Sequence, residues 1–156
     1  MSTALETAFA EMETRLGAIR KVNGFNTDIG LGLHPAGTYL TEEDAPCLAL
    51  YESRPDDSGV MRIDASSKPN ACGMDFEVAY MVQGFVTRVG TESPLHVAEE
   101  AAEDILRALM GANRGALTSA SMHSITGRGR GLTVKGGNVV PVLVFGRFVV
   151  NEKVYQ

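Results

Sequence analysis

The residues of this chain that could bind a metal or act as a nucleophile are few and far apart. His34, His96 and His123 are the only histidines, and no two of them have the spacing of ligands on one helix. Cys47 and Cys72 do not form a Cys-x-x-Cys motif, and no His-Glu-x-x-His motif is present. The sequence therefore predicts no metal site and no cofactor.

A glycine- and arginine-rich stretch at residues 127–131 is superficially similar to a phosphate-binding loop. It lacks the Lys-Ser/Thr ending of a P-loop, and it does not connect a strand to a helix. We interpret it instead as a flexible loop. Its side chains Arg128 and Arg130 would contact acidic protein surfaces or a nucleic-acid backbone.

Serine and carboxylate patterns do not indicate catalysis either. No Gly-x-Ser-x-Gly motif is present, so no nucleophile elbow is predicted. Asp56-Asp57 and the acidic residues 42–44 fall in predicted loops, where solvated charge is the usual explanation. A general acid–base pair formed in space is an open alternative that the spacing does not support. We predict that the protein is not an enzyme.

The clearest surface pattern is an acidic helix predicted between Ser93 and Gly111. Ser93 is a good N-cap and Pro94 suits the first helical position. The predicted core stripe is Leu95, Ala98, Ala102, Ile105, Leu106 and Leu109. The predicted acidic face is Glu99, Glu100, Glu103 and Asp104. This face is either simply solvated, which is the commoner case, or it faces a partner or a channel.

An amphipathic helix is predicted at the N-terminus. Its apolar residues recur at three- and four-residue steps: Leu5, Phe9, Met12, Leu16 and Ile19. Thr3 and Glu6 have the spacing of a capping box. Asn23-Gly24 supplies a left-handed stop, and residues 25–33 are compatible with a short strand.

Three further apolar segments predict strands. Residues 47–51 read as a central strand covered on both faces. Residues 75–89 alternate in polarity, with Gly84 marking a bulge or bend. Residues 139–150 are rich in β-branched side chains, and Pro141 places their start near a sheet edge. A hairpin turn is predicted at residues 136–138.

These elements predict an α/β (α+β) fold, with a mixed, mainly antiparallel sheet and two main helices packed against it. The chain has 156 residues, which suits a single domain over 1–156. The segment at about residues 54–74 is predicted to be a long loop or arm that orders on assembly.

Composition limits the possible partners. The net charge is −5, which argues against a nucleic-acid-binding surface that must neutralise phosphates. No signal peptide and no apolar run long enough to cross a membrane is visible. Two cysteines are too few for a disulfide framework. We expect a soluble protein made in a reducing cytoplasm.

The order of these landmarks resembles the tail terminator proteins of long-tailed bacteriophages, the group that includes the minor tail protein U type. The likeness covers nearly the whole chain, through short motifs. The first landmarks are an N-terminal helix ending in residues 23–30 and a proline-led apolar strand at 44–52. A long strand, an acidic helix ending near Leu109-Met110, the segment 125–128 and a β-rich end follow in the same order.

The resemblance implies a structural protein that forms a ring, usually a hexamer. Such a ring caps the tail tube, stops its polymerisation and presents the head-joining surface. Its partners would be further copies of itself, the tube protein and a head completion or connector protein, with genomic DNA passing through the lumen without specific binding. The protein would be in the virion, at the head-proximal end of the tail, after assembly in the host cytoplasm. No membrane contact is implied.

Charged loop residues are the candidate contacts in such a ring. For the interface with neighbouring subunits or the tube we predict Arg128, Arg130, Asp56, Asp57 and Arg62. The acidic face of the helix at 93–111 would line the lumen or meet a neighbour. Two alternatives stay open: another head–tail connector or tail-completion protein, and a small ligand-binding α/β domain.

Overall fold

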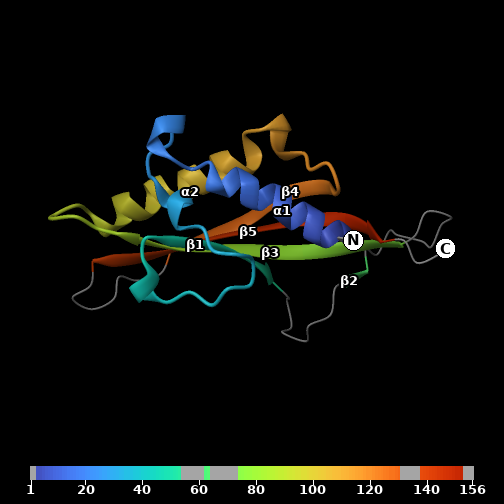
Figure 1. The fold of residues 1–156 in the computed structure, drawn as a ribbon, viewed down its shortest axis with the longest axis horizontal. Coiled ribbons are helices and arrows are strands. Elements are labelled where there is room, and N and C mark those ends of the chain that lie inside the picture. The colour runs from blue at the N-terminus through green and yellow to red at the C-terminus, as the bar shows by residue number, and fades with distance from the viewer. Residues whose placement is uncertain (1–2, 54–61, 64–73, 131–137, 153–156) are drawn as a thin grey trace.

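A four-strand antiparallel path forms the centre of the structure, and two helices cover one of its faces (Figure 1). The computed structural model describes residues 3–53, 62–63, 74–130 and 138–152, without the side chains of residues 62, 63 and 130. The strands lie in the order β1-β3-β5-β4, and the short β2 pairs with β3. This arrangement confirms the predicted α+β fold with a mainly antiparallel sheet.

The bounds of the elements follow the chain order. The helices are α1 (Ala4–Gly17) and α2 (Pro94–Met110), and the strands are β1 (Cys47–Ser53), β2 (Arg62–Ile63), β3 (Met74–Thr87), β4 (Ser121–Arg130) and β5 (Val139–Glu152). Four single-turn 3₁₀ helices join them: η1 (Lys21–Asn23), η2 (Ile29–Gly32), η3 (Glu42–Asp44) and η4 (Asn113–Gly115).

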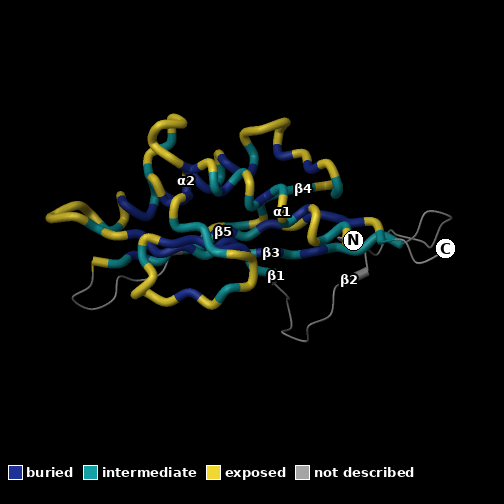
Figure 2. The backbone as a smooth tube through the Cα atoms, viewed as in Figure 1, coloured by how far each residue is buried: buried dark blue, intermediate teal, exposed yellow. Residues whose placement is uncertain are grey.

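The core lies between the helices and the sheet, where buried backbone follows the middle of β3 and β5 (Figure 2). Val78, Tyr80 and Val82 of β3 are buried, while the residues between them are half-buried. This alternation is the predicted period of two. The predicted stripe of α1 also packs here, with Met12, Leu16 and Ile19 fully buried.

Both helices begin where capping chemistry predicts. The Thr3 hydroxyl accepts a hydrogen bond from the Glu6 amide at 3.1 Å. Ser93 occupies the N-cap position of α2 and Pro94 is its first residue, but the Ser93 side chain makes no capping hydrogen bond. The predicted stop at Gly24 is wrong for α1, which ends at Gly17. Gly24 ends η1 instead, with a left-handed φ of 88°.

Two strand predictions need correction. Residues 25–33 contain η2 (Ile29–Gly32) rather than a strand, and only Leu33 among them bridges β1, at Leu48. Strand β1 is at the edge of the sheet, not in its centre. Its residues 47–50 are nevertheless buried because the preceding segment runs along its free edge, where the His34 amide bonds the Leu48 carbonyl at 2.8 Å.

Two further predictions concern glycines in strands. Residues 127–130 are not a loop but the end of β4, paired with residues 142–145 of β5. No bulge occurs at Gly84, whose pairing with Leu48 and Val142 is in continuous register. Pro141 lies in an inner strand rather than an edge strand, because β5 is between β3 and β4 and Pro141 pairs with Phe85 of β3.

A polar clamp joins α1 to the end of α2. The Arg15 guanidinium donates to the Leu109 carbonyl at 2.9 Å and to the Ala116 carbonyl at 2.5 Å. Glu11 binds Arg15 at 3.2 Å and accepts hydrogen bonds from the amide and hydroxyl of Thr118. The clamp satisfies carbonyls that the end of α2 leaves free and fixes the path into β4.

His123 on β4 is half-buried, and both of its ring nitrogens have hydrogen-bond partners. Its Nε2 lies 2.5 Å from the Tyr80 hydroxyl, and its Nδ1 lies 2.6 Å from the Gly115 carbonyl. A neutral ring that donates from Nδ1 and accepts at Nε2 satisfies both partners. Burial lowers the pKa of His123, while the hydrogen bond with Gly115 opposes that shift.

Stability should therefore fall when the solution is acidified. The lowered pKa means that, below about pH 6.5, the unfolded chain takes up a proton before the folded chain does. This contribution to stability is complete above that pH. It is lost as the pH falls from the pKa of His123 in the unfolded chain towards its lower pKa in the folded chain. We expect the urea midpoint to drop between about pH 7.5 and about pH 5.5, and to drop less in His123→Gln. Equal pH dependence in both proteins would contradict this assignment.

Candidate assembly surfaces

Three of the four predicted acidic residues lie on the accessible side of α2. Glu103 is exposed, and Glu99 and Glu100 are half-exposed. Glu100 lies 2.7 Å from His96 one turn earlier, and Glu99 lies 3.1 Å from Arg128 of β4. Part of the negative charge is thus balanced within the chain.

Asp104 does not belong to the acidic face, which corrects the sequence prediction. It is fully buried and turned towards the segment after η1. Its carboxylate accepts hydrogen bonds from the Asn26 amide at 2.9 Å, the Thr27 amide at 2.8 Å and the Thr27 hydroxyl at 2.7 Å. Arg107, one turn later, donates to the Gly24 carbonyl at 3.3 Å. Asp104 therefore anchors this segment to α2.

The two arginines of the glycine-rich stretch sit on a strand, where the register determines their surroundings. Arg128 pairs with Val144, whose side chain is buried beneath the helices, so Arg128 is on the helix side of the sheet. This explains how it reaches Glu99. The backbone of Arg130 pairs with Val142, two residues along the same ladder. Gly127 and Gly129 face the opposite side, beside Phe145 and Leu143.

The remaining predicted contacts are described only in part. The backbone of Arg62 pairs with Glu77 in the short ladder between β2 and β3. Asp56 and Asp57 lie outside the described residues, as does most of the predicted arm at 54–74. The structure therefore brings Arg128 and Glu99 together and separates Asp104 from them.

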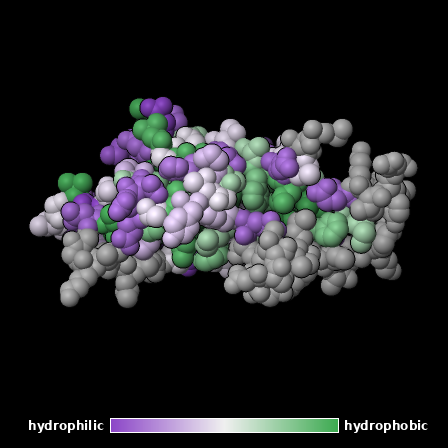
Figure 3. Space-filling model, turned by 60° about the horizontal axis from the view of Figure 1, so that its bottom comes forward, coloured by the Kyte–Doolittle hydropathy of each residue, from purple (hydrophilic) through white to green (hydrophobic). Residues whose placement is uncertain are grey.

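Several hydrophobic side chains are exposed at positions that the sequence patterns did not reveal. Val22, Leu31, Val89 and Leu95 are between 55% and 78% exposed, and Met122 is 71% exposed. Leu95 was predicted in the core stripe of α2, but it lies in the first turn and points to solvent. In Figure 3, green patches lie among purple side chains at the left end of the molecule. Single apolar residues in turns give no periodic signal, so these positions were not predictable from the sequence.

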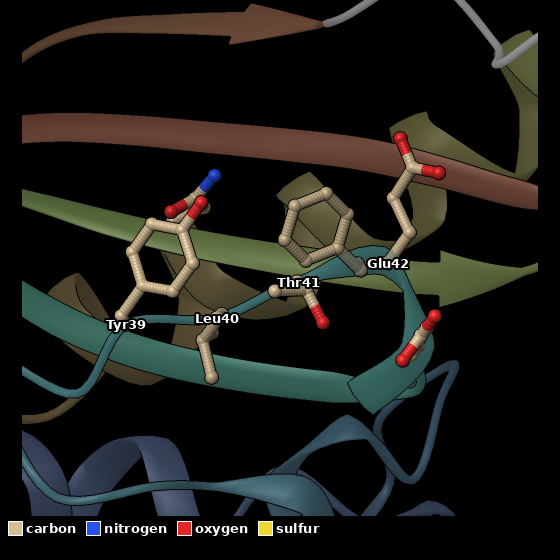
Figure 4. A pocket seen from close by; sticks show the side chains of 7 residues that line it. Tyr39, Leu40, Thr41 and Glu42 are labelled. Atoms are coloured by element: carbon tan, nitrogen blue, oxygen red, sulfur yellow. The ribbon is translucent and has the colours of Figure 1, made fainter.

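A cavity of 540 Å³ lies between β3 and the segment around η3 (Figure 4). Tyr39, Thr41 and Glu42 line it, together with Gln83 and Phe85 of β3. It contains neither histidine nor cysteine. Across the described residues no group of three or more His, Cys, Asp or Glu side chains is placed to hold a metal. The polar lining of the cavity consists of the carboxylates of Glu42 and Glu43, the hydroxyls of Tyr39 and Thr41 and the amide of Gln83.

No helix in the described part of the chain is long and apolar enough to cross a membrane. No protein-family model matches the sequence, and no curated protein matches it. A chain from a structure described as the virion of a native gene transfer agent (GTA) particle has a similar fold. Its TM-score is 0.59 at 12% sequence identity, and the likeness covers 97% of this chain and 99% of that chain. At this identity the similarity establishes a shared fold.

Proposed function

We propose that the chain is a structural protein of a phage-like virion, and specifically a tail terminator. The observation that carries this proposal is the fold shared with a chain of the GTA virion, which extends over almost the full length of both chains. The resemblance of the sequence to tail terminators supports the finer assignment. The ring would end the growth of the tail tube and form the surface that joins the head.

The charge of the chain suits a conduit for DNA. Six chains of −5 each would carry −30. Negative charge around a lumen repels phosphates, which keeps the genome from adhering as it passes. Glu103 and the partly balanced Glu99 and Glu100 are our candidates for this surface.

Two alternatives make different predictions about location. Another head–tail connector or tail-completion protein would share the virion but need not contact the last tube ring. A ligand-binding domain would be absent from the virion, and its best candidate site would be the cavity beside η3. That cavity is open and has Tyr39, Glu42 and Glu43 in its lining, which gives little enclosed apolar surface for a ligand.

Gold-labelled antibodies against the chain, imaged on intact particles and on isolated tails, would test the proposal. We expect one label position per particle, at the head-proximal end of the tail, and the same position on tails that have not joined a head. Label on heads but never on free tails would favour a connector. Absence of label from all particles would exclude a virion role.

The arginines of β4 offer a test of the subunit contact predicted from the sequence. We expect Arg128→Glu together with Arg130→Glu to shift light scattering towards smaller particles, because two cations become two anions. Arg128 also binds Glu99 within the chain, so the control exchanges that pair as Arg128→Glu with Glu99→Arg. An oligomer unchanged by the double reversal would remove these arginines from the interface. If the exchange variant restores the wild-type particle size, Arg128 acts through its ion pair with Glu99 within the chain and not through a neighbouring subunit.

A further inference from the structure

Four exposed hydrophobic residues belong to the segments that line one pocket. Val22 belongs to η1, Leu31 to η2, Val89 follows β3, and Leu95 is in the first turn of α2. The turn between β3 and α2 projects at the left of Figure 1, with the start of α2 next to it. Concentrations of exposed apolar side chains of this kind mark contact surfaces more often than scattered single residues do.

The pocket has a volume of 280 Å³. Its apolar wall includes Ile29, Pro46, Val86 and Val97, and the exposed Val89 also lines it. A pocket of this size can receive a long side chain from another molecule.

The charge around the pocket is negative. Asp28, Glu92 and Glu100 line it together with a single cation, Lys21, which leaves two net negative charges. A partner with an apolar side chain and an adjacent cation would match both the wall and the charge of the pocket.

Met122, on β4, is an exposed apolar side chain at the other end of the sheet. It lies in a β-bulge, where three steps along β4 from Ser121 to Ser124 oppose two steps along β5. Its φ is 54°, a left-handed conformation that is strained for a side chain of this kind. The bulge turns His123 inwards to Tyr80 and leaves Met122 exposed to solvent.

The only arginine in the adjoining η4 is Arg114, which is exposed. The hydrogen bond from His123 to the Gly115 carbonyl, at 2.6 Å, holds this turn against β4. Methionine and arginine are both enriched in protein interfaces. Met122 and Arg114 therefore supply an exposed apolar side chain and an exposed cation on two segments that this hydrogen bond holds together.

The pairing of β5 with β3 and β4 shows how far the pocket beside Val89 lies from Met122. β3 ends at Thr87, opposite Val139, whereas β4 begins at Ser121, opposite Val149. Val139 and Val149 are ten positions apart along β5, or about 33 Å at the rise of a β-strand. Two different surfaces this far apart can meet reciprocally in an antiparallel two-fold pair or head to tail, and the head-to-tail contact is the one that can close a ring. The proposed ring requires the head-to-tail contact.

We propose that Met122 of one copy inserts into the pocket beside Val89 of the next copy, with Arg114 facing Glu92 or Glu100 on its rim. This inference rests on the proposed ring and identifies the contact that builds it. The occupant of the pocket is a second copy of the chain. A flexible, polarizable side chain such as methionine adapts well to an irregular pocket.

Sedimentation equilibrium of the purified chain with three single variants would test the contact. Met122→Asp and Val89→Asp alter the two halves, and Tyr39→Asp is the control, because Tyr39 is 85% exposed and belongs to neither surface. We expect the wild type and the control to form assemblies larger than a dimer. Either of the other variants should associate at least about 30-fold more weakly, as for loss of a central interface residue. All three positions are exposed, so circular dichroism should show native folds.

Mixing the two defective variants tests whether Met122 of one copy meets the pocket of another, while wild-type assemblies larger than a dimer exclude a reciprocal two-fold pair. Met122→Asp keeps an intact pocket and Val89→Asp keeps an intact Met122, so together they can form one good contact. The resulting dimer presents only the two defective surfaces, and we therefore expect 1:1 dimers and no ring.

Met122→Gly adds an independent readout, because glycine accepts the left-handed conformation without strain. It should melt at a higher temperature and yet associate more weakly than the wild type. Unaltered assembly of Met122→Asp, or mixtures that form no dimers, would overturn the proposal. So would a wild-type chain that stays monomeric up to about 1 mM, since an interface of ordinary size would be populated there. That last result would leave the antibody labelling of tails to decide the proposed function.

Discussion

Replacement of Asp104 by alanine is expected to lower the free energy of unfolding by about 3 kcal/mol. The buried carboxylate accepts three hydrogen bonds, all from Asn26 and Thr27, and these donors would lose their common acceptor. Urea unfolding followed by circular dichroism would measure the change. The loss should appear as a lower midpoint with an unchanged slope, because the folded state keeps its overall burial.

Glu103→Ala is the matched control, since it removes a carboxylate from the adjacent, exposed position of the same helix. We expect a change within about 0.5 kcal/mol. Asp104→Asn keeps the size of the side chain and replaces one acceptor oxygen by a donor group, so its effect should fall between the two. Equal midpoints for Asp104→Ala and Glu103→Ala would contradict the anchoring role of Asp104.

Replacement of Gly146 by alanine is expected to destabilise the fold by about 3 kcal/mol, near the upper end of the cost of overpacking a core. Gly146 pairs directly with Tyr80 across β3 and β5, and the tyrosine ring lies over it. A methyl group at this position would overlap Oη and Cζ of Tyr80. The Tyr80 side chain is fully buried and its hydroxyl is hydrogen-bonded to His123, so the ring has no open space to move into.

Gly127→Ala is the control for this change. Gly127 is also a strand glycine, but a methyl group there would meet no atom within 4 Å. Its effect should be within about 1 kcal/mol and can be stabilising. Thermal unfolding of the two variants side by side would compare them. A Gly146→Ala protein as stable as Gly127→Ala would show that Tyr80 can move aside, against our description of a close-packed core.

The sequence predicted best those elements whose signals are local. Pro94 placed the start of α2 correctly because its fixed φ suits the first helical position. Thr3 placed the start of α1 correctly because its capping hydrogen bond acts within one turn of its own helix. The alternation along β3 likewise reported which residues face the helices. These signals depend on the two faces or ends of a single element and need no knowledge of its neighbours.

Predictions failed where a distant segment determines the environment. Asp104 has the same chemistry as Glu103, and it is buried because Asn26 and Thr27, about eighty residues earlier, fold back onto it. The glycines at 127 and 129 suggested a loop, yet pairing with β5 makes them part of a strand. The exposure of Met122 depends on a bulge whose register exists only once β4 has paired.

The measurement that tests the proposed termination most directly is the length of tails made without this chain. Particles would be produced from a genome in which its gene is disrupted, and the tails imaged by negative stain. The account predicts tubes of uncontrolled length that fail to join heads, and restoration of one fixed length when the intact chain is supplied. Tails of normal length joined normally to heads would contradict it.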